Sequence, residues 1–219
     1  VKDINVLTRT LAERIDRERK QVVVVDLESG EESRLPYDSL VIATGGSPIV
    51  PPMDGLDLAG VFRLGHPADA VAIREAIENS SVDKVAVIGG GLIGLEVADA
   101  LSNQGLDVAV LEMQDQLLPG VLDSDMAALL TRHLSSKGMD LRLGARVTGL
   151  EGDSEGRFTA ALTERGRVEA DLAILAIGVR PNVKLASDAG LRLGPTGAIA
   201  VDEYLRTSDP AIYAGGDCV

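Results

Sequence analysis

The chain has 219 residues, of which 45% are apolar and 25% charged, an ordinary balance for a soluble globular protein of one large or two small domains. Its formal net charge of −13 argues against nucleic acid and anionic membranes as partners, and no apolar run approaches the ~20 residues that span a bilayer. A single cysteine excludes a disulfide framework and a cysteine-rich metal site, so no metal is expected, and a reducing cytoplasm fits.

The first part of the chain is rich in predicted strands. Gln21–Leu27 is apolar and β-branched, the charged segment Glu31–Arg34 is expected to turn, and Leu40–Ala43 is expected to be a buried strand. Residues 48–66 are rich in proline and glycine, which predicts a crossing between domains. Because the sequence starts in mid-pattern at Val1, without an initiator methionine, we expect a fragment or a processed piece.

The next predicted elements are a helix and a strand–turn–helix–strand unit. The helix covers Pro67–Asn79. A short apolar run, Val85–Ile88, then stops at three glycines with the spacing G-x-G-x-x-G. A helical pattern follows, and a second apolar run, Val108–Leu111, ends in Glu112. This order of elements is typical of a dinucleotide-binding unit.

Each part of this unit meets a steric or electrostatic need of a bound dinucleotide. Gly89 allows the sharp turn out of the strand, Gly91 lets the backbone approach a pyrophosphate, and Gly94 lets helix and strand pack closely. The N–H groups at the helix start, together with the helix dipole, hold the phosphate charge. The segment predicted to bind NAD(H) is Gly89, Gly90, Gly91, Leu92, Ile93 and Gly94. A phosphate-binding P-loop is rejected, because Leu95 and Glu96 stand where it has Lys and Ser or Thr.

Glu112 predicts the choice of coenzyme. Its carboxylate is placed to accept hydrogen bonds from the adenosine ribose, where NADP(H) would instead carry a phosphate. Residues 113–116 include no Arg or Lys, and Asp115 adds a negative charge. Like charges across an interface cost several kcal/mol, so we expect NAD(H) to be preferred by roughly a hundredfold or more.

The rest of the chain returns to strands. A helix capped by Asp123 or Ser124 is predicted to run to about Lys137. Strands are then expected at Asp140–Leu143, Phe158–Thr163, Ala170–Ile177 and within Ala198–Tyr213, with a second crossing at residues 179–182. The middle is a complete unit and both ends are strand-rich and incomplete. The pattern therefore predicts an α/β fold in which a Rossmann-like, three-layer nucleotide domain is inserted into part of another domain.

Four motifs in order carry a resemblance to the pyridine nucleotide–disulfide oxidoreductase family, in particular to its coenzyme A-disulfide reductases and NADH oxidases. They are Tyr37–Gly45, the glycine turn with Gly94-Leu95-Glu96, Ala176–Asn182 and Thr207–Asp217. The resemblance covers nearly the whole chain. It implies a partial FAD-binding domain at 1–78, an NAD(H)-binding domain at 79–182, and a return to the FAD-binding domain at 183–219.

The resemblance also implies roles for single residues. Asp217 would hydrogen-bond the ribityl chain of FAD, and Thr44 with Gly45 would lie near the flavin nucleotide. Gly178 would line the nicotinamide side of the NAD cleft, and Glu96 would be the catalytic acid that pairs with a lysine beside the flavin.

The sequence departs from the family at two points. The family's N-terminal FAD-binding turn and redox cysteine do not occur in it. Leu92 stands where many members carry a gating aromatic residue, which puts such a gate in doubt. Cys218 is not at the redox position and is expected to be a small buried residue.

The expected function is the NAD(H)-binding portion of a flavin-dependent NADH oxidoreductase, which passes hydride from NADH to FAD and on to a disulfide, oxygen or a protein acceptor. The fragment alone is expected to be inactive, and its parent is expected to be a cytoplasmic homodimer. Two alternatives stay open, a stand-alone NAD(H)-binding module and a simple NAD-dependent dehydrogenase. The second needs a proton-transfer residue near the nicotinamide, and none stands out in the sequence.

Overall fold

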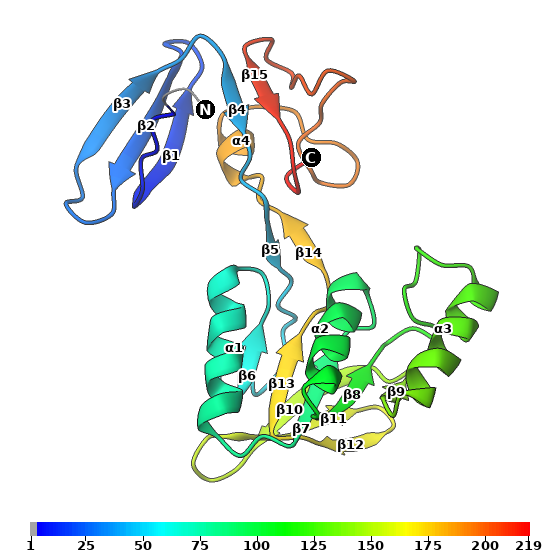
Figure 1. The fold of residues 1–219 in the computed structure, drawn as a ribbon. Helices are drawn as coiled ribbons and strands as arrows, with labels where there is room; N and C mark the ends of the chain where they lie inside the picture. Colours follow the sequence, from blue (N-terminus) through cyan, green and yellow to red (C-terminus); the bar gives the residue numbers. More distant parts are fainter. Residues whose placement is uncertain (1–3) are drawn as a thin grey trace. The chain divides into compact units, whose positions relative to one another are not determined.

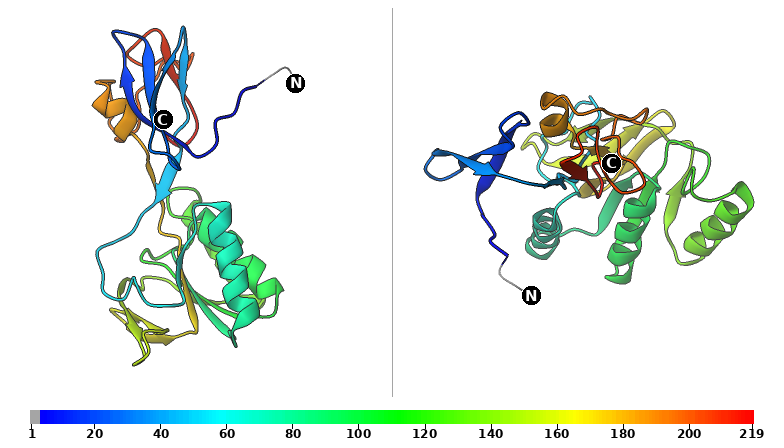
Figure 2. Two further views of the ribbon diagram at one scale, coloured as in Figure 1. Left: turned by 90° about the vertical axis from the view of Figure 1, so that its left-hand side faces the viewer. Right: turned by 90° about the horizontal axis from the view of Figure 1, so that it is seen from above.

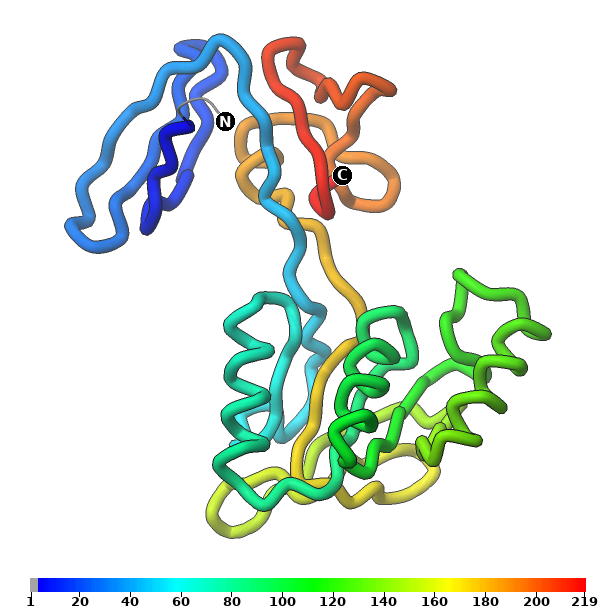
Figure 3. The backbone as a smooth tube through the Cα atoms, in the orientation of Figure 1, coloured from blue at the N-terminus to red at the C-terminus, as the bar shows by residue number. Residues whose placement is uncertain are grey.

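The computed structural model describes residues 4–219, which divide into two compact units. The split unit comprises the chain up to Ser47 and again Arg180–Val219, and the inserted unit is Pro48–Val179. The chain passes between the units twice, along the paired strands β5 (Gly46–Pro48) and β14 (Val179–Pro181), as the tube in Figure 3 makes visible. The prediction of one α/β domain inserted into another is confirmed.

The compact units divide the chain at other positions than the domains predicted from the sequence, which are 1–78, 79–182 and 183–219. Strand β6 (Val61–Arg63) pairs in parallel with β13 (Leu172–Leu175). Helix α1 (Pro67–Asn79) contributes Ile73 to the same core. Residues 48–78 therefore pack with the inserted unit, because they supply an edge strand and a covering helix to its sheet.

The inserted unit is built on a five-stranded parallel sheet in the order β6-β13-β7-β8-β9. The strands not yet given are β7 (Lys84–Ile88), β8 (Asp107–Leu111) and β9 (Asp140–Arg142). Helix α2 (Leu92–Asn103) connects β7 to β8, and α3 (Ser124–Ser136) connects β8 to β9. Helices α1, α2 and α3 cover one face of this sheet (Figure 1).

The central strands are apolar on both faces, because side chains alternate along a strand and both faces are covered. In β7, Val85 and Val87 pack in the core beneath the helices, whereas Ala86 and Ile88 pack in the core on the opposite face. The unbroken apolar run from Val85 to Ile88 follows from this double burial.

An antiparallel sheet in the order β10-β11-β12 forms the third layer. Its strands are β10 (Val147–Gly152), β11 (Phe158–Thr163) and β12 (Gly166–Glu169). Phe158 and Val168 pack in the same core as Ala86. The left view of Figure 2 shows this sheet and the helices on opposite sides of the parallel sheet, so the predicted three layers are confirmed.

The split unit combines a meander with a short parallel pair. The meander has the order β1-β2-β3, with strands β1 (Thr10–Asp16), β2 (Gln21–Asp26) and β3 (Glu32–Pro36). The parallel pair is β4 (Leu40–Ile42) and β15 (Ile212–Ala214), and the one helix described in this unit is α4 (Lys184–Asp188). Arg17 joins the two parts, because its Nε donates to Asp209 Oδ2 at 2.7 Å and its Nη1 to the Ala189 carbonyl at 3.2 Å.

Several predicted elements agree with the structure. Helix α1 has the predicted bounds, and a capping box between His66 and Asp69 fixes its start. Helix α3 begins after Asp123 and ends before Lys137, as predicted. The strands expected at Phe158–Thr163 and within Gln21–Leu27 are present as β11 and β2.

Two predictions are wrong. The segment Glu31–Arg34, which was expected to turn, lies largely in strand β3. The turn comes before it in the chain, where Asp26 Oδ1 accepts hydrogen bonds from the N–H groups of Glu28 and Ser29. Strand β3 is exposed along its length and so tolerates charged residues that resemble a turn. Most of Ala198–Tyr213 is loop, because Asp202 accepts the N–H groups of Tyr204 and Arg206 and closes a turn there.

Candidate functional site

The glycine turn between β7 and α2 brings backbone against backbone. Gly89 has a φ of +116°, and a Cβ on it would lie 2.3 Å from the Ala176 carbonyl oxygen. A Cβ on Gly94 would lie 2.0 Å from the Gly89 carbonyl oxygen. Both glycines are required for the fold itself, in the turn and helix-packing roles that their spacing predicts.

Gly91 differs from these two glycines, because packing does not require a glycine there: a Cβ on it would meet nothing within 4 Å. Its φ of −82° is open to any residue, and it is the N-cap of α2 without a side-chain cap bond. The first N–H groups of a helix have no partner within the helix, and the helix dipole favours an anion beside them. The missing side chain therefore leaves open the approach to the start of α2, and helix starts of this kind can hold an anion.

Glu112 follows β8, and its carboxylate is buried, with 7% of the residue exposed. Its Oε2 accepts the Gly90 N–H at 2.6 Å, and its Oε1 accepts the Gln114 N–H at 2.7 Å. The carboxylate thus ties the glycine turn to the segment after β8, a role that sequence reasoning missed. Each oxygen keeps acceptor capacity, so a ribose hydroxyl can still bond there.

These residues border a cleft of about 830 Å³ within the inserted unit, a volume typical of ligand sites. The cleft lies where β7, β8 and β13 end, since Ile88, Leu111 and Ala176 all border it. Ligands of open parallel sheets bind at this edge. The lining residues also include Pro51, Pro52, Met53, Met113, Leu118, Pro119, Val121 and Arg146.

Most of the predicted nucleotide-binding residues meet in this cleft. Those that line it are Gly89, Gly91, Leu92, Ile93, Glu112 and Gly178. Gly178 has a φ of +119°, and its carbonyl oxygen accepts the Ile49 N–H at 2.9 Å. Gly90 and Gly94 do not line the cleft: the first is buried with its N–H bonded to Glu112, and the second packs on Gly89.

The residues that the resemblance assigns to FAD lie in the split unit, after its two parallel strands. Thr44 and Gly45 follow β4, and Asp217 follows β15. The Gly215 N–H donates to the Ile42 carbonyl at 3.0 Å, which holds the two strand ends together. Asn182 fixes the first pair, because its Nδ2 donates to the Thr44 carbonyl at 3.0 Å and its N–H to the Gly45 carbonyl at 2.9 Å. Thr44 and Asp217 are exposed.

Two further predicted residues have different surroundings. Glu96 lies on an exposed face of α2, does not line the cleft, and takes part in no ion pair among residues 4–219. Cys218 is fully buried in the core of the split unit, as expected. Within the described part of the chain, no group of three or more His, Cys, Asp or Glu side chains could hold a metal ion.

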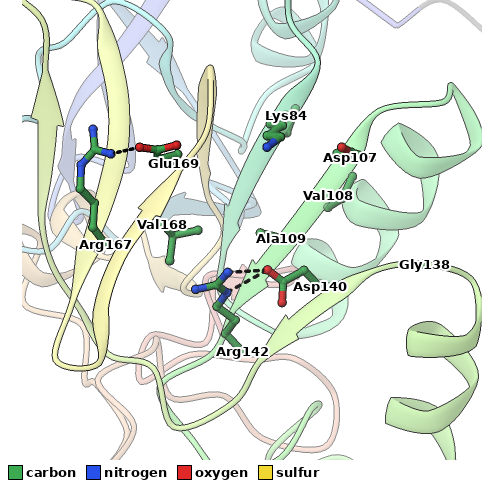
Figure 4. Close-up of a pocket in the computed structure, with 11 residues that line it drawn as sticks. Lys84, Asp107, Val108, Ala109, Gly138, Asp140, Arg142, Arg167, Val168 and Glu169 are labelled. Atoms are coloured by element: carbon green, nitrogen blue, oxygen red, sulfur yellow. Dashed lines mark hydrogen bonds and ion pairs between the residues drawn. The ribbon is translucent and has the colours of Figure 1, made fainter.

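A second hollow, of about 600 Å³, lies at the opposite edge of the parallel sheet (Figure 4). Lys84, Asp107 and Asp140, the first residues of β7, β8 and β9, border it. Its arginines are already paired, Arg142 with Asp140 at 2.8 Å and Arg167 with Glu151 at 2.6 Å. It has three basic and three acidic side chains and lies away from the strand ends where nucleotides bind, so we assign no ligand to it.

Arg146 is the one basic residue that lines the cleft, and it was not predicted from the sequence. It directly precedes β10, a strand that was not predicted because two glycines interrupt its apolar pattern. The Ala145 N–H donates to the Glu112 carbonyl at 2.8 Å, and the Gly144 N–H donates to the Gln114 carbonyl at 2.8 Å. This ladder brings Arg146 beside the end of β8, although 34 positions separate it from Glu112.

No helix among the described residues is both long and apolar enough to cross a membrane. The family model described as "Pyridine nucleotide-disulphide oxidoreductase" matches residues 1–219. An NADH oxidase of Methanocaldococcus jannaschii is 41% identical over 218 residues, which are 100% of this chain and 48% of that protein. An NAD(P)H coenzyme A polysulfide/persulfide reductase of Pyrococcus horikoshii is 40% identical over 190 residues, 87% of this chain and 42% of that protein.

The fold of the chain is also similar to that of a solved structure. The NAD-dependent persulfide reductase from A. fulgidus superimposes with a TM-score of 0.94 at 45% identity, over 100% of this chain and 40% of that one. The chain therefore spans about half or less of the length of the proteins it matches.

Proposed function

The chain belongs to the pyridine nucleotide-disulphide oxidoreductase family, and from this premise we propose that it is the NAD(H)-binding portion of a flavin-dependent NADH oxidoreductase. The observation that carries the proposal is the cleft beside the glycine turn, where Gly91 leaves open the approach to the start of α2. A pyrophosphate there would accept N–H bonds from the first helical turn.

The cleft fits the rest of a dinucleotide. The Glu112 carboxylate lies in its wall with acceptor capacity left for the adenosine ribose. Ala176 and Gly178 border the cleft after β13, where the nicotinamide half would lie. The φ of +119° at Gly178 would strain any residue that has a side chain, although a Cβ there would only be in ordinary contact with Ile49 Cδ1 at 3.4 Å. Apolar neighbours such as Leu92 and Ile93 would exclude water from this end.

The split unit supplies only part of an FAD site. Thr44, Gly45 and Asp217 follow paired parallel strands, a placement that suits a nucleotide ligand. Residues 4–219 contain one strand–glycine turn–helix unit, and the inserted unit uses it. When bound, FAD would accept the hydride of NADH and pass electrons to a disulfide, oxygen or a protein acceptor. Glu96 remains a proposed partner of a lysine beside it.

A titration with NADH tests the proposal. We expect the chain to bind NADH without FAD, because the inserted unit forms the cleft by itself. Gly91→Val should abolish binding without unfolding the chain, since its side chain would extend into open space on the path of the pyrophosphate. Gly194→Val is the matched control: it lies in the split unit, and its nearest neighbour would be 3.8 Å from the new Cβ.

NADH fluorescence gives the affinities, and circular dichroism shows whether each variant is folded. Equal affinity of the wild type and folded Gly91→Val would remove the glycine turn from the site. A folded wild-type chain that binds no NADH would refute the proposed function. The cytoplasmic location, the homodimer and the electron acceptor of the parent stay predictions of the sequence.

A further inference from the structure

One cation in the cleft bears on which dinucleotide binds. Of the residues that line the cleft, Arg146 alone is basic, and Glu112 alone is acidic. Arg146 is exposed and takes part in none of the ion pairs found among residues 4–219. In a chain with a net charge of −13, a cationic side chain in the cleft without an acidic partner among these residues is available to an anionic ligand.

The position of Arg146 relative to Glu112 is fixed by the backbone. Segments 144–145 and 112–114 are joined by two N–H bonds of 2.8 Å, from Ala145 to the Glu112 carbonyl and from Gly144 to the Gln114 carbonyl. The Arg146 carbonyl accepts the Glu164 N–H at 3.2 Å, which anchors its other side. A guanidinium carried by this segment therefore borders the same part of the cleft as the proposed ribose acceptor.

Glu112 and Asp115 repel a phosphate on the ribose less strongly than the sequence alone indicates. The Glu112 carboxylate is buried and already accepts two backbone N–H bonds, whose dipoles offset its charge. Asp115 does not line the cleft. Its Oδ1 lies beside Gly144 and near Arg165, since a Cβ on Gly144 would be 2.8 Å from Asp115 Oδ1 and 2.6 Å from Arg165 Nη2.

We infer that Arg146 is a specificity-determining residue, which contacts the 2′-phosphate of NADP(H) and so allows the site to accept it beside NAD(H). The inference rests on the proposed function, because it assumes that the adenosine ribose lies at Glu112. A guanidinium presents a planar fork of N–H donors that matches phosphate oxygens, and an arginine near this ribose is a general means of holding the extra phosphate. The preference for NADH is then smaller than the hundredfold expected from the sequence.

Binding of NADH and NADPH to the full chain tests the inference. Arg146→Gln should weaken NADPH about tenfold and leave NADH within about twofold, because a charge-assisted hydrogen bond is lost for one ligand only. Arg146→Lys should restore part of the NADPH affinity, since the charge returns without the fork. Arg132→Gln, an exposed arginine on α3 outside the cleft, is the control and should change neither affinity.

The comparison is made at low and at moderate salt, where the effect of Arg146→Gln should shrink as screening rises. An equal loss of both coenzymes would mean that Arg146 contacts the shared part of the dinucleotide, and it would overturn the inference. Unchanged NADPH affinity would overturn it as well. In both cases wild-type binding of NADH leaves the proposed function standing, whereas a folded wild type that binds neither coenzyme refutes the function and the inference together.

Discussion

In both the inserted and the split unit, the predicted nucleotide-binding residues follow the carboxyl ends of parallel strands. The two units differ in how completely their parallel sheets are covered. In the inserted unit the parallel sheet has five strands, with helices on one face and the β10-β11-β12 sheet on the other. In the split unit the parallel sheet described has two short strands, and Val41 at the centre of β4 is 66% exposed. Parallel strands are normally buried on both faces, so the second sheet lacks cover that the first has.

The difference follows from how each site is arranged along the sequence. Residues 84–112 are a continuous strand–turn–helix–strand unit, so the glycine turn, the helix start and Glu112 are positioned by local contacts. The split unit joins ends that are far apart in sequence, β4 to β15 and Arg17 to Asp209. A self-contained ligand site is therefore expected in the inserted unit only.

The largest expected effect of a substitution is at Gly94. Gly94→Ala would place a Cβ 2.0 Å from the Gly89 carbonyl oxygen, where only backbone could give way. We expect the free energy of unfolding of the inserted unit to fall by about 4 kcal/mol or more, as overpacking at a backbone contact does in extreme cases. Gly91→Ala is the control and should cost less than about 1 kcal/mol, because its Cβ meets nothing within 4 Å and alanine is only a poorer N-cap than glycine. Urea unfolding followed by circular dichroism measures both, and a stable Gly94→Ala would contradict this account of the turn.

The next largest effect is expected at Glu112. Glu112→Ala removes the acceptor from the buried Gly90 N–H and from the part-buried Gln114 N–H, and an unsatisfied buried group costs about 1–3 kcal/mol. We therefore expect a loss of about 3 kcal/mol in stability in addition to weaker NADH binding. Glu112→Gln keeps one acceptor oxygen and should recover roughly half of that loss. If Glu112→Ala unfolds at the same urea concentration as the wild type, the two hydrogen bonds of the carboxylate do not stabilise the fold.

The sequence predicts local features well and contacts between distant segments poorly. The roles of Gly89, Gly91 and Gly94 could be predicted from the sequence, because the spacing of the three glycines reflects the steric requirements of the turn. Helix α1 could also be predicted from the sequence, because a proline at its start and an apolar face indicate where it begins and ends. Arg146 could not be assigned, because only the pairing of residues 144–145 with 112–114 brings it to the cleft. The two hydrogen bonds of the Glu112 carboxylate were hidden for the same reason, since side-chain direction depends on packing.

A smaller effect is expected in the split unit at acid pH. The Arg17 guanidinium, together with the Ala211 N–H, lowers the pKa of Asp209, and Lys20 adds to the effect. A carboxyl group whose pKa is lowered by folding stabilises the protein above its unfolded pKa of about 3.9, and this stabilisation is lost as the pH falls through the folded value. We expect Arg17→Gln to cost about 1 kcal/mol near neutral pH, because the pair is partly exposed to solvent.

The cost of Arg17→Gln should shrink as the pH falls below the unfolded pKa of about 3.9 toward the lowered folded pKa of Asp209, because protonation of Asp209 removes the charge that Arg17 stabilises. The difference in unfolding free energy between wild type and variant, measured across the acid range, isolates this pair from other carboxyl groups. A difference that stays constant from pH 7 to pH 3 would show that Arg17 acts through its bonds to the Ala189 and Gly190 carbonyls instead.

The smallest effect is expected from adding FAD. A ligand stabilises the folded state in proportion to the logarithm of its concentration over its Kd, about 2.7 kcal/mol at a hundred times Kd. NADH should therefore raise the melting temperature of the chain, because the cleft of the inserted unit is complete. FAD should raise it very little, and the purified chain should be colourless, because Thr44, Gly45 and Asp217 follow a sheet without a glycine turn into a helix. Differential scanning calorimetry with each cofactor compares the two units in one sample. A shift of many degrees with micromolar FAD would mean that two short parallel strands suffice to hold the flavin nucleotide.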